Sequence, residues 1–180
     1  SSKQLLPELE NLVNRCAKKT THVVEGGQTR AASSYEGIRS LSTSENLKVL
    51  IHDAARPFVS GELISRCLSA LDHFDAVSPT LPLDETIFEL LDERVQTIPD
   101  RSTHRKVQTP QGFKLHTIKA AHEEFHKDQT FHPTDDCGIV LKYSPQTPIG
   151  VVNGDETNIK ITHPTDMILA RAIHYENTNS

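Results

Sequence analysis

Two polar side chains that could act on a phosphate follow a short apolar run containing β-branched residues, Leu47–Ile51. Asp53 and Arg56 come directly after this run, in the sequence HDAARPF. An aspartate can hold Mg²⁺, and an arginine can form a forked contact with a phosphate. Open α/β sheets bind ligands at the carboxyl ends of their strands, so this position favours a ligand site. The alternative is an ordinary strand-to-helix turn with a surface ion pair.

Basic residues gather at two further places. Arg101, Arg105 and Lys106 lie close together, which is typical either of a phosphate clamp or of a solvated charged face. Lys160 stands between apolar neighbours in a segment predicted to be extended, Asn158–Thr162. A lysine held by a strand is better positioned than one on a helix surface. Taken alone, however, Lys160 is more simply interpreted as an exposed strand lysine.

A third pattern is HExxH, formed by His122, Glu123 and His126, with His132 six residues later. Two histidines four residues apart on a helix can ligate zinc while the glutamate acts as general base. The extended form of this pattern has a glycine where Gln129 stands, and the 10 histidines of the chain make chance matches easier. Solvated surface histidines are therefore the favoured interpretation, and a zinc hydrolase is the alternative.

Helices and strands must position these side chains. Apolar spacing predicts helices at 4–16, 30–41, 61–71, 115–125 and 166–174, and strands at 21–24, 47–51, 76–81 and 148–153. Helix and strand alternate through the first half of the chain. This order favours an α/β fold, with a parallel sheet and helices packed on it.

The middle of the chain changes character. Residues 84–91 and 94–98 predict a hairpin that turns at Asp92-Glu93 and stands off the main sheet. A hairpin alone is barely stable in water, so its apolar side chains need cover. A second subunit is one source of that cover.

Two motifs mark expected helix starts. The glycines of Glu25-Gly26-Gly27 let backbone approach a ligand closely, and Ser33 and Ser34 in the following helix could face that ligand. Most such turns only connect elements, so this signal is weak alone. Thr134-Asp135-Asp136 is interpreted as an N-cap run, with acids where the helix dipole favours them.

Composition narrows the class of protein. A chain of 180 residues is expected to form one domain with its own core, and a net charge of −5 argues against a nucleic-acid-binding surface. There is no apolar run long enough for a transmembrane helix, and we expect no signal peptide at SSKQLLPELE, because it lacks a basic region followed by an apolar one. Cys16, Cys67 and Cys137 are odd in number and far apart, so no disulfide framework is expected. We therefore expect a cytoplasmic protein without nucleic-acid or membrane partners.

Seven stretches, in order, resemble one family. They are EGGQTRAASS at 25–34, HDAARPF at 52–58, DETI at 84–87, IPDR at 98–101, QTPQGF at 108–113, TDDCGIV at 134–140 and GDETNIKITHPTD at 154–166. They resemble the 2-C-methyl-D-erythritol 4-phosphate cytidylyltransferases and their close relatives, the ribitol-5-phosphate cytidylyltransferases. The resemblance implies a Rossmann-like, mostly parallel α/β domain spanning 1–180, with a dimerising β-arm at about 83–103. It also implies transfer of a cytidylyl group from CTP, with Mg²⁺, to a polyol phosphate.

The resemblance implies site residues as well. The CTP-binding residues would be Gly27, Gln28, Ser33, Ala54 and Lys160, and the acceptor-binding residues Arg56, Thr86, Arg101 and Thr109. Thr86 and Arg101 would act on the acceptor phosphate of the neighbouring subunit. Asp53 would lie beside Mg²⁺ and the acceptor, and Lys160 would steady the α-phosphate in the transition state as a compact charge.

The chain departs from the family pattern in several places. The family begins with a strand and a Gly-rich loop that wraps the triphosphate, and this loop is not in the sequence, so we expect the domain to be N-terminally incomplete. The family often has an acid at the position of Gln28, and the methylerythritol enzymes usually have a lysine at that of Phe88. Methylerythritol phosphate, for isoprenoid precursors, is the favoured acceptor. Ribitol phosphate, for cell-surface polymers, and a non-catalytic dimerisation module are the alternatives.

Overall fold

The computed structural model describes residues 3–16, 22–41, 47–128 and 130–179, which fall into two compact units. The first unit comprises residues 1–49 and 113–148, and the second comprises 50–112 and 149–180. Each unit has its own buried side chains. The single-domain organisation expected from the sequence stays a prediction.

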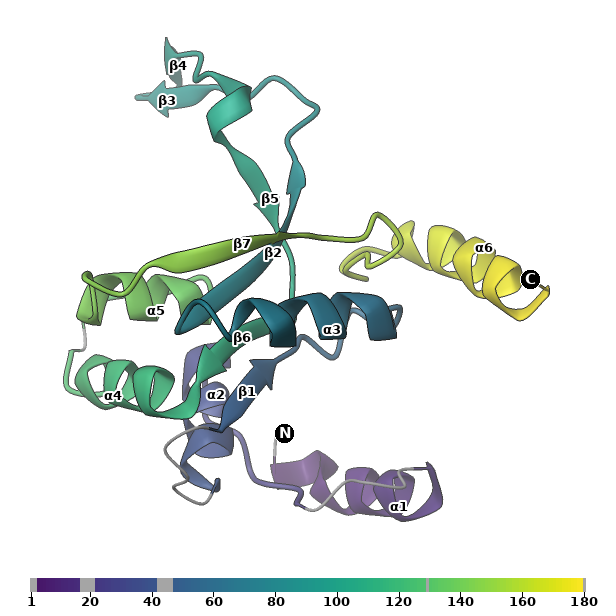
Figure 1. Ribbon diagram of the computed structural model, residues 1–180. Helices are drawn as coiled ribbons and strands as arrows, with labels where there is room; N and C mark the ends of the chain where they lie inside the picture. Colours follow the sequence, from purple (N-terminus) through teal and green to yellow (C-terminus); the bar gives the residue numbers. More distant parts are fainter. Residues whose placement is uncertain (1–2, 17–21, 42–46, 129, 180) are drawn as a thin grey trace. The chain divides into compact units, whose positions relative to one another are not determined.

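The first unit is built from helices (Figure 1). They are α1 (Leu6–Cys16), preceded by the 3-10 turn η1 (Lys3–Leu5), α2 (Arg30–Arg39), α4 (Leu115–Phe125) and α5 (Asp136–Tyr143). Ile118 and Ala121 of α4 and Ile139 and Val140 of α5 are fully buried, which gives this unit its apolar core. The predicted helices at 4–16, 30–41 and 115–125 are confirmed, with Pro7 in the first turn of α1.

The second unit contains the sheet strands β2 (Ala76–Pro82), β5 (Arg105–Val107) and β7 (Ile149–Asn153). The strands β1 (Lys48–Ile51) and β6 (Gln111–Lys114) run across the boundary between the units, and the strand order is β1-β6-β2-β5, with β7 paired to β2. β7 is parallel to β2, and β5 is antiparallel to it. The chain is therefore an α/β protein with a mixed sheet, whose β2–β7 pair shows the expected parallel arrangement.

One helix, α3 (Gly61–Ala70), packs on this sheet. Leu63, Cys67, Leu71 and Val77 have no exposed surface, and Leu50, Val59, Ala70 and Val152 pack against them. A Cβ atom on Gly112 would lie 2.7 Å from Cγ2 of Val77, so β6 reaches this core only because that residue lacks a side chain.

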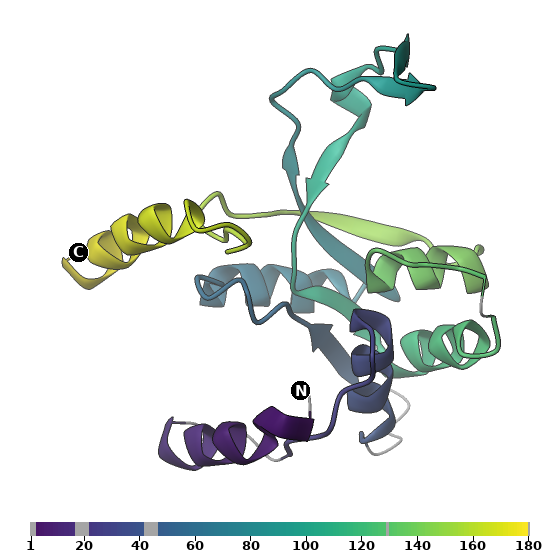
Figure 2. The same ribbon diagram turned by 180° about the vertical axis from the view of Figure 1, so that it is seen from behind.

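The predicted hairpin is confirmed as β3 (Glu89–Leu91) paired with β4 (Arg94–Thr97). Asp92 and Glu93 have φ values of 50° and 61°, which is the backbone of a tight two-residue turn. Figures 1 and 2 show the hairpin projecting from the sheet beyond β2 and β5, beside the short turn η2 (Arg101–Thr103). Its large apolar side chains are more than half exposed: Phe88, Leu90, Leu91, Val95 and Ile98.

Several local predictions were wrong. Residues 22–24 of the strand expected at 21–24 have no regular structure, and Thr21 lies outside the described residues. Asn158–Thr162 has no regular structure rather than forming a strand, and the strand Gln111–Lys114 was not among the predicted strands. The last helix, α6 (Asp166–Asn179), continues beyond the predicted end. Among the described residues, no helix is both long and apolar enough to cross a membrane.

Candidate functional site

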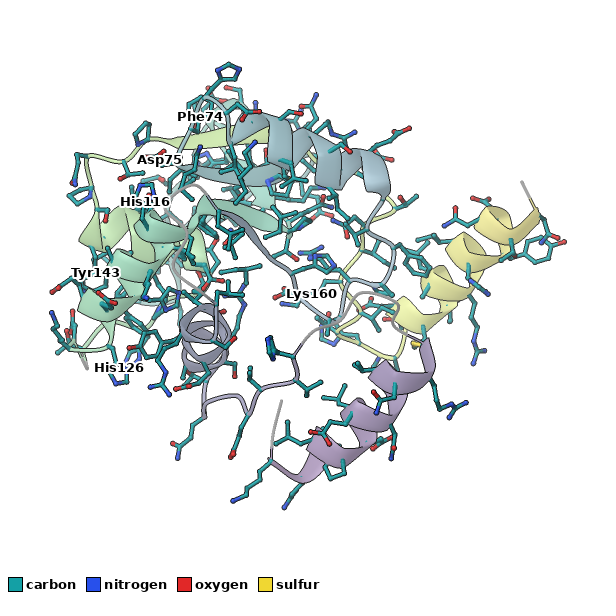
Figure 3. All side chains as sticks on the ribbon, turned by 60° about the horizontal axis from the view of Figure 1, so that its bottom comes forward. Phe74, Asp75, His116, His126, Tyr143 and Lys160 are labelled. Carbon is teal, nitrogen blue, oxygen red and sulfur yellow. The ribbon has the colours of Figure 1, made fainter. Side chains whose placement is uncertain are left out.

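In the second unit the turn after β1 meets the loop between β7 and α6. Lys160 Nζ, on that loop and labelled in Figure 3, lies 2.9 Å from Asp53 Oδ2. Asp53 is largely buried, at 15% exposure, whereas Lys160 is 43% exposed. The N–H of Ile161 donates to the carbonyl of Ala55 at 2.8 Å. Backbone hydrogen bonding to the 52–56 turn, rather than a strand, therefore holds the lysine beside the carboxylate.

Arg56 joins the same turn to two other segments. Its Nη1 donates to the carbonyl of Asn158 at 2.8 Å, and its Nη2 donates to that of Val107 at 3.4 Å. Burial lowers the pKa of Arg56, and the neighbouring Asp53 partly offsets this by raising it. The guanidinium is thus anchored on protein carbonyls, so Arg56 organises the site in addition to any contact it makes with a phosphate.

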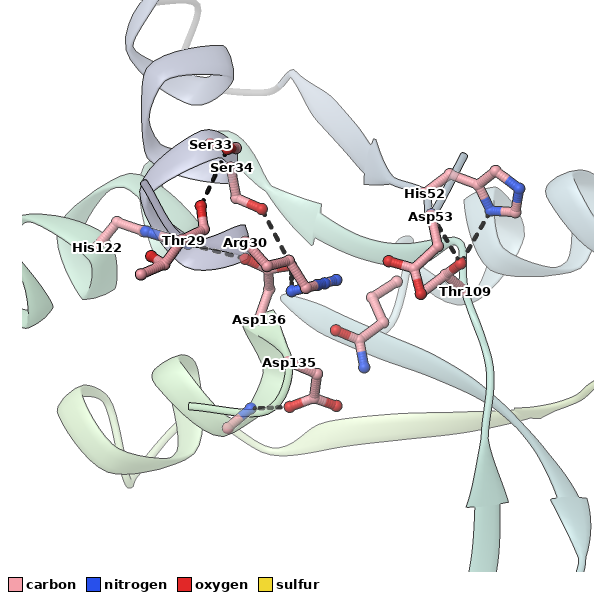
Figure 4. A network of polar contacts seen from close by, with 12 residues as sticks. Thr29, Arg30, Ser33, Ser34, His52, Asp53, Thr109, His122, Asp135 and Asp136 are labelled. Carbon is pink, nitrogen blue, oxygen red and sulfur yellow. Dashed lines mark hydrogen bonds and ion pairs between the residues drawn. The ribbon is translucent and has the colours of Figure 1, made fainter. Parts of the chain in front are cut away.

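Thr109 lies next to Asp53. Its side chain is almost fully buried, and Oγ1 accepts a hydrogen bond from the Asp53 N–H at 3.0 Å. The same oxygen lies 3.0 Å from Nδ1 of His52, as Figure 4 shows. Residues from the HDAARPF and QTPQGF stretches are therefore in direct contact.

Buried amides beneath these residues were not singled out from the sequence. Gln108 donates from Nε2 to the carbonyl of Asp155 at 2.9 Å and accepts from its N–H at 3.1 Å. Asn158, which has no exposed surface, donates to the carbonyl of Thr109 at 2.8 Å. Asp155 accepts from Ser60 Oγ at 2.6 Å and pairs with Arg66. Both amides lie in matched stretches, but only the fold reveals that they hold the loop that carries Lys160.

Three of the expected CTP-binding residues, Gly27, Gln28 and Ser33, lie in the first unit, at the start of α2. A Cβ atom on Gly27 would lie 2.3 Å from Cβ of Ala32, so only glycine fits at this position without a shift of the backbone. Ser33 Oγ donates to the carbonyls of Thr29 at 3.0 Å and Gly27 at 3.3 Å. Gln28 is exposed on this turn. The turn is thus fixed from within, with Gln28 facing solvent.

A buried ionic cluster joins α2, α4 and α5 in the first unit (Figure 4). Asp136 has no exposed surface, and its Oδ2 accepts from Arg30 Nη1 at 2.7 Å and from Ser34 Oγ at 3.5 Å. Its other oxygen lies 3.0 Å from His122 Nε2. Asp135, the residue before it, caps α5 by accepting from the Gly138 N–H at 2.8 Å. The predicted capping by acids is confirmed for Asp135, whereas Asp136 serves the cluster.

This cluster corrects the interpretation of the HExxH pattern. His122 was expected on the solvated surface, but it is fully buried against Asp136. His126 instead stacks on Tyr35, with ring centroids 5.0 Å apart. Gln129 lies outside the described residues. In the part of the chain that the structure describes, no group of three or more His, Cys, Asp or Glu side chains is placed to hold a metal, so the zinc alternative lacks support.

Residues of the β-arm lie on exposed surface. Thr86 is exposed, and Arg101 Nη1 donates to the carbonyl of Asp84 at 2.7 Å. Lys106 Nζ lies 3.0 Å from the carboxylate of the same aspartate. Asp84 thereby gathers two of the basic side chains that the sequence singled out as a phosphate clamp or a solvated face.

Comparison with known proteins gives consistent matches. A family model described as 2-C-methyl-D-erythritol 4-phosphate cytidylyltransferase (IspD) matches residues 2–176. The chain is 40% identical over 161 residues to the 2-C-methyl-D-erythritol 4-phosphate cytidylyltransferase of Thermobifida fusca, covering 86% of this chain and 65% of that protein. It is 37% identical over 166 residues to the bifunctional ribulose 5-phosphate reductase/CDP-ribitol pyrophosphorylase Bcs1 of Haemophilus influenzae, covering 90% and 35%.

A solved structure agrees with these matches. The 4-diphosphocytidyl-2C-methyl-D-erythritol synthase of Anaerococcus prevotii superposes with a TM-score of 0.86 at 31% identity, covering 95% of this chain and 77% of that one. The chain spans less than two thirds of the length of the two curated relatives above.

We predict that Asp136→Ala strongly destabilises the protein. Removal of the carboxylate leaves Arg30 and His122 without their shared partner, and breaking a buried pair typically costs about 3–5 kcal/mol. The matched control is Asp84→Ala, which breaks an exposed pair with Lys106 and should cost at most about 1 kcal/mol. Urea unfolding of the two variants measures both values, and equal losses would contradict a structural function for the cluster.

Proposed function

The chain belongs to the 2-C-methyl-D-erythritol 4-phosphate cytidylyltransferase family, and we propose on this premise that it is a CTP-dependent cytidylyltransferase. The reaction joins CTP and 2-C-methyl-D-erythritol 4-phosphate to give the CDP-polyol and pyrophosphate, in isoprenoid precursor synthesis. The family resemblance inferred from seven stretches is thereby confirmed. The observation that carries the proposal is the meeting of Asp53, Thr109 and Lys160, from three separate segments, in one unit.

The proposed reaction is a direct displacement at phosphorus. A phosphate oxygen of the acceptor forms a bond to the α-phosphorus of CTP, and pyrophosphate leaves with the electron pair of the broken bond. No covalent enzyme intermediate is needed, so catalysis consists of positioning and of neutralising negative charge in the transition state. Lys160 is the proposed source of that charge, because the Ile161–Ala55 hydrogen bond fixes its segment.

Asp53 is the proposed Mg²⁺ ligand. Mg²⁺ is usually held by one or two carboxylates together with substrate phosphates, so a single largely buried carboxylate at a strand's end fits this ion. When bound, Mg²⁺ would neutralise charge on the triphosphate of CTP. The residues of this chain supply the carboxylate and the adjacent lysine.

Nucleotide and acceptor contacts complete the proposal. Gly27, Gln28 and Ser33 contact the base and Ala54 the ribose, while Arg56 and Thr109 hold the acceptor. The close packing of Gly27 on Ala32 supports a fixed backbone position for this turn. The anchoring of Arg56 on two carbonyls supports a fixed position for its charge.

The proposal includes a cytoplasmic homodimer formed through the arm. The exposed apolar residues of β3 and β4, such as Leu90 and Val95, support this because a hairpin needs cover. Thr86 and Arg101 then serve the neighbouring subunit's acceptor phosphate. A Rossmann-like, mostly parallel sheet is also proposed, and the parallel β2–β7 pair supports it.

Ribitol 5-phosphate is the second candidate acceptor. The similarity to a CDP-ribitol pyrophosphorylase from Haemophilus influenzae favours it, as does Phe88, which stands where the methylerythritol enzymes usually have lysine. A non-catalytic dimerisation module is the remaining alternative to an enzyme.

Pyrophosphate release with CTP and Mg²⁺ tests the proposed function. The chain is assayed as it stands and extended at its N-terminus with the family's Gly-rich segment, with each polyol phosphate offered separately. Turnover of the extended form with methylerythritol phosphate alone is the expected result, and its turnover with ribitol phosphate alone transfers the proposal to that acceptor. If neither form released pyrophosphate with either acceptor, the enzyme proposal would be overturned in favour of the non-catalytic dimerisation module.

We predict that Lys160→Ala lowers kcat by about 10²–10³, the cost of removing one preorganised group that stabilises transition-state charge. Stability should fall less than for Asp136→Ala, because Lys160 and Asp53 are both more exposed than Arg30 and Asp136 are. Lys127→Ala, which removes an exposed lysine paired with Glu124, is the control and should leave kcat unchanged. Initial rates and thermal unfolding measure these effects, and an unchanged kcat for Lys160→Ala would remove it from the reaction.

We predict that Arg101→Ala raises the KM for the acceptor by about 10-fold while changing kcat little. A phosphate clamp supplies binding that is equal in ground and transition states, so its loss appears in KM. Arg94→Ala, on the same arm, is the matched control. Steady-state kinetics with varied acceptor distinguish the two variants, and equal KM values for both would exclude the clamp.

A further inference from the structure

Two hydrogen bonds link the 52–56 turn to Thr109 within the second unit (Figure 4), and a third lies within the turn itself. The Asp53 N–H donates to Thr109 Oγ1 at 3.0 Å, and this oxygen lies 3.0 Å from His52 Nδ1. His52 Nε2 lies 2.9 Å from the carbonyl oxygen of Arg56. Thr109 is 5% exposed, so water competes little for these bonds.

These three hydrogen bonds form a hydrogen-bond chain, and in the neutral imidazole the groups at its two ends fix the direction of each bond. A backbone carbonyl only accepts, so His52 Nε2 carries the hydrogen that is donated to Arg56. Nδ1 of the neutral ring is then an acceptor, and the hydrogen it receives is that of the Thr109 hydroxyl. The hydroxyl oxygen accepts in turn from Asp53. The tautomer of His52 with its hydrogen on Nε2 therefore gives every donor in the hydrogen-bond chain an acceptor.

We propose that His52 is a positioning residue for the reaction, which acts through Thr109 on Asp53. The inference rests on the proposed function, in which Asp53 and Lys160 are at the reacting phosphates. By accepting the Thr109 hydrogen, His52 turns an oxygen lone pair to the Asp53 N–H. This holds the backbone at the point where the Asp53 carboxylate meets Lys160. Misplacement of such a group by roughly 1 Å can cost about 10²-fold in rate.

The same chain determines what Thr109 can offer to a substrate. Its one hydrogen is committed to His52, so its hydroxyl presents only a lone pair. The matching group on the acceptor is a donor, such as a hydroxyl of the polyol. A phosphate oxygen, which accepts hydrogen bonds and is largely unprotonated at neutral pH, does not match.

If His52 had only a structural function, its contact within the 52–56 turn would be sufficient and its contact with Thr109 would not affect the reaction. The Nε2 bond to Arg56 closes that turn together with the Arg56 N–H, which donates to the Asp53 carbonyl at 2.9 Å. The Nδ1 bond to Thr109 is the one that the proposal requires. The two ring nitrogens therefore separate a structural function from a positioning one.

Two variants each keep one of these hydrogen bonds and remove the other. In His52→Asn the amide oxygen replaces Nδ1 and can still accept from Thr109, whereas in His52→Gln the amide nitrogen replaces Nε2 and can still donate to Arg56. We expect His52→Gln to lower kcat/KM for the acceptor by 10- to 100-fold, and His52→Asn to recover most of that loss. Recovery by glutamine instead of asparagine, with both variants folded, would overturn the proposal.

A double-mutant cycle tests whether His52 acts through Thr109. Thr109→Val keeps the shape of the side chain and removes both of its hydrogen bonds. We expect the double variant His52→Gln/Thr109→Val to be no slower than Thr109→Val alone, because the two residues form one path. Additive losses would show that His52 acts by another route and would overturn the proposal.

A spectroscopic measurement keeps this inference separate from the proposed function. Long-range ¹H–¹⁵N NMR of the ligand-free chain reports which ring nitrogen of His52 carries hydrogen, and His52→Gln assigns the signal. We expect hydrogen on Nε2, with the Nδ1 resonance shifting in Thr109→Val. The opposite tautomer would overturn the inference even in an active enzyme. The expected tautomer in a chain that turns over neither acceptor would show that the proposed function, rather than the hydrogen-bond chain, had failed.

Discussion

The organisation of the second unit depends on buried amide side chains that hydrogen-bond to backbone. The Gln108 amide hydrogen-bonds to both the backbone carbonyl and the backbone N–H of Asp155, and the Asn158 amide donates to the carbonyl of Thr109. A buried polar group that loses its partner costs about 1–3 kcal/mol, so these bonds strongly favour one arrangement of an irregular loop. That loop carries Lys160 to Asp53 without any strand to hold it. The geometry at the proposed reacting centre is thus set by contacts that lie beneath it.

Much of the fold could be predicted from local patterns, and the exceptions have physical causes. The helices α1, α3 and α4 have apolar residues at helical spacing, which the sequence shows directly. The strand β6 was missed because Gln111 and Gly112 have little strand propensity, and burial against the sheet overrides this. The segment 158–162 alternates apolar and polar residues as a strand would. Its backbone is instead bonded to the 52–56 turn, a tertiary contact that no local pattern reveals.

The candidate site likewise contains residues that could be predicted from the sequence and residues that could not. Asp53, Arg56, Thr109 and Lys160 could be named from matched stretches, and the structure brings them into contact within one unit. The partners that orient them could not be named, because an amide or imidazole in a matched stretch gives no sign of what it faces. The HExxH pattern shows the converse. His122 and His126 have metal-ligand spacing, but one is committed to Asp136 and the other to Tyr35, so spacing alone misled.

The arm and the proposed active site share one continuous length of backbone. The antiparallel strand β5 ends at Val107, whose carbonyl accepts from Arg56, and the next two residues are Gln108 and Thr109. Thr80 of β2 lies opposite Val107, so the root of the arm is part of the sheet itself. A molecule that contacted the projecting hairpin would therefore lie on the same length of chain as the residues that hold Asp53. The root of the hairpin and the residues that hold Asp53 therefore follow one another on a single length of backbone.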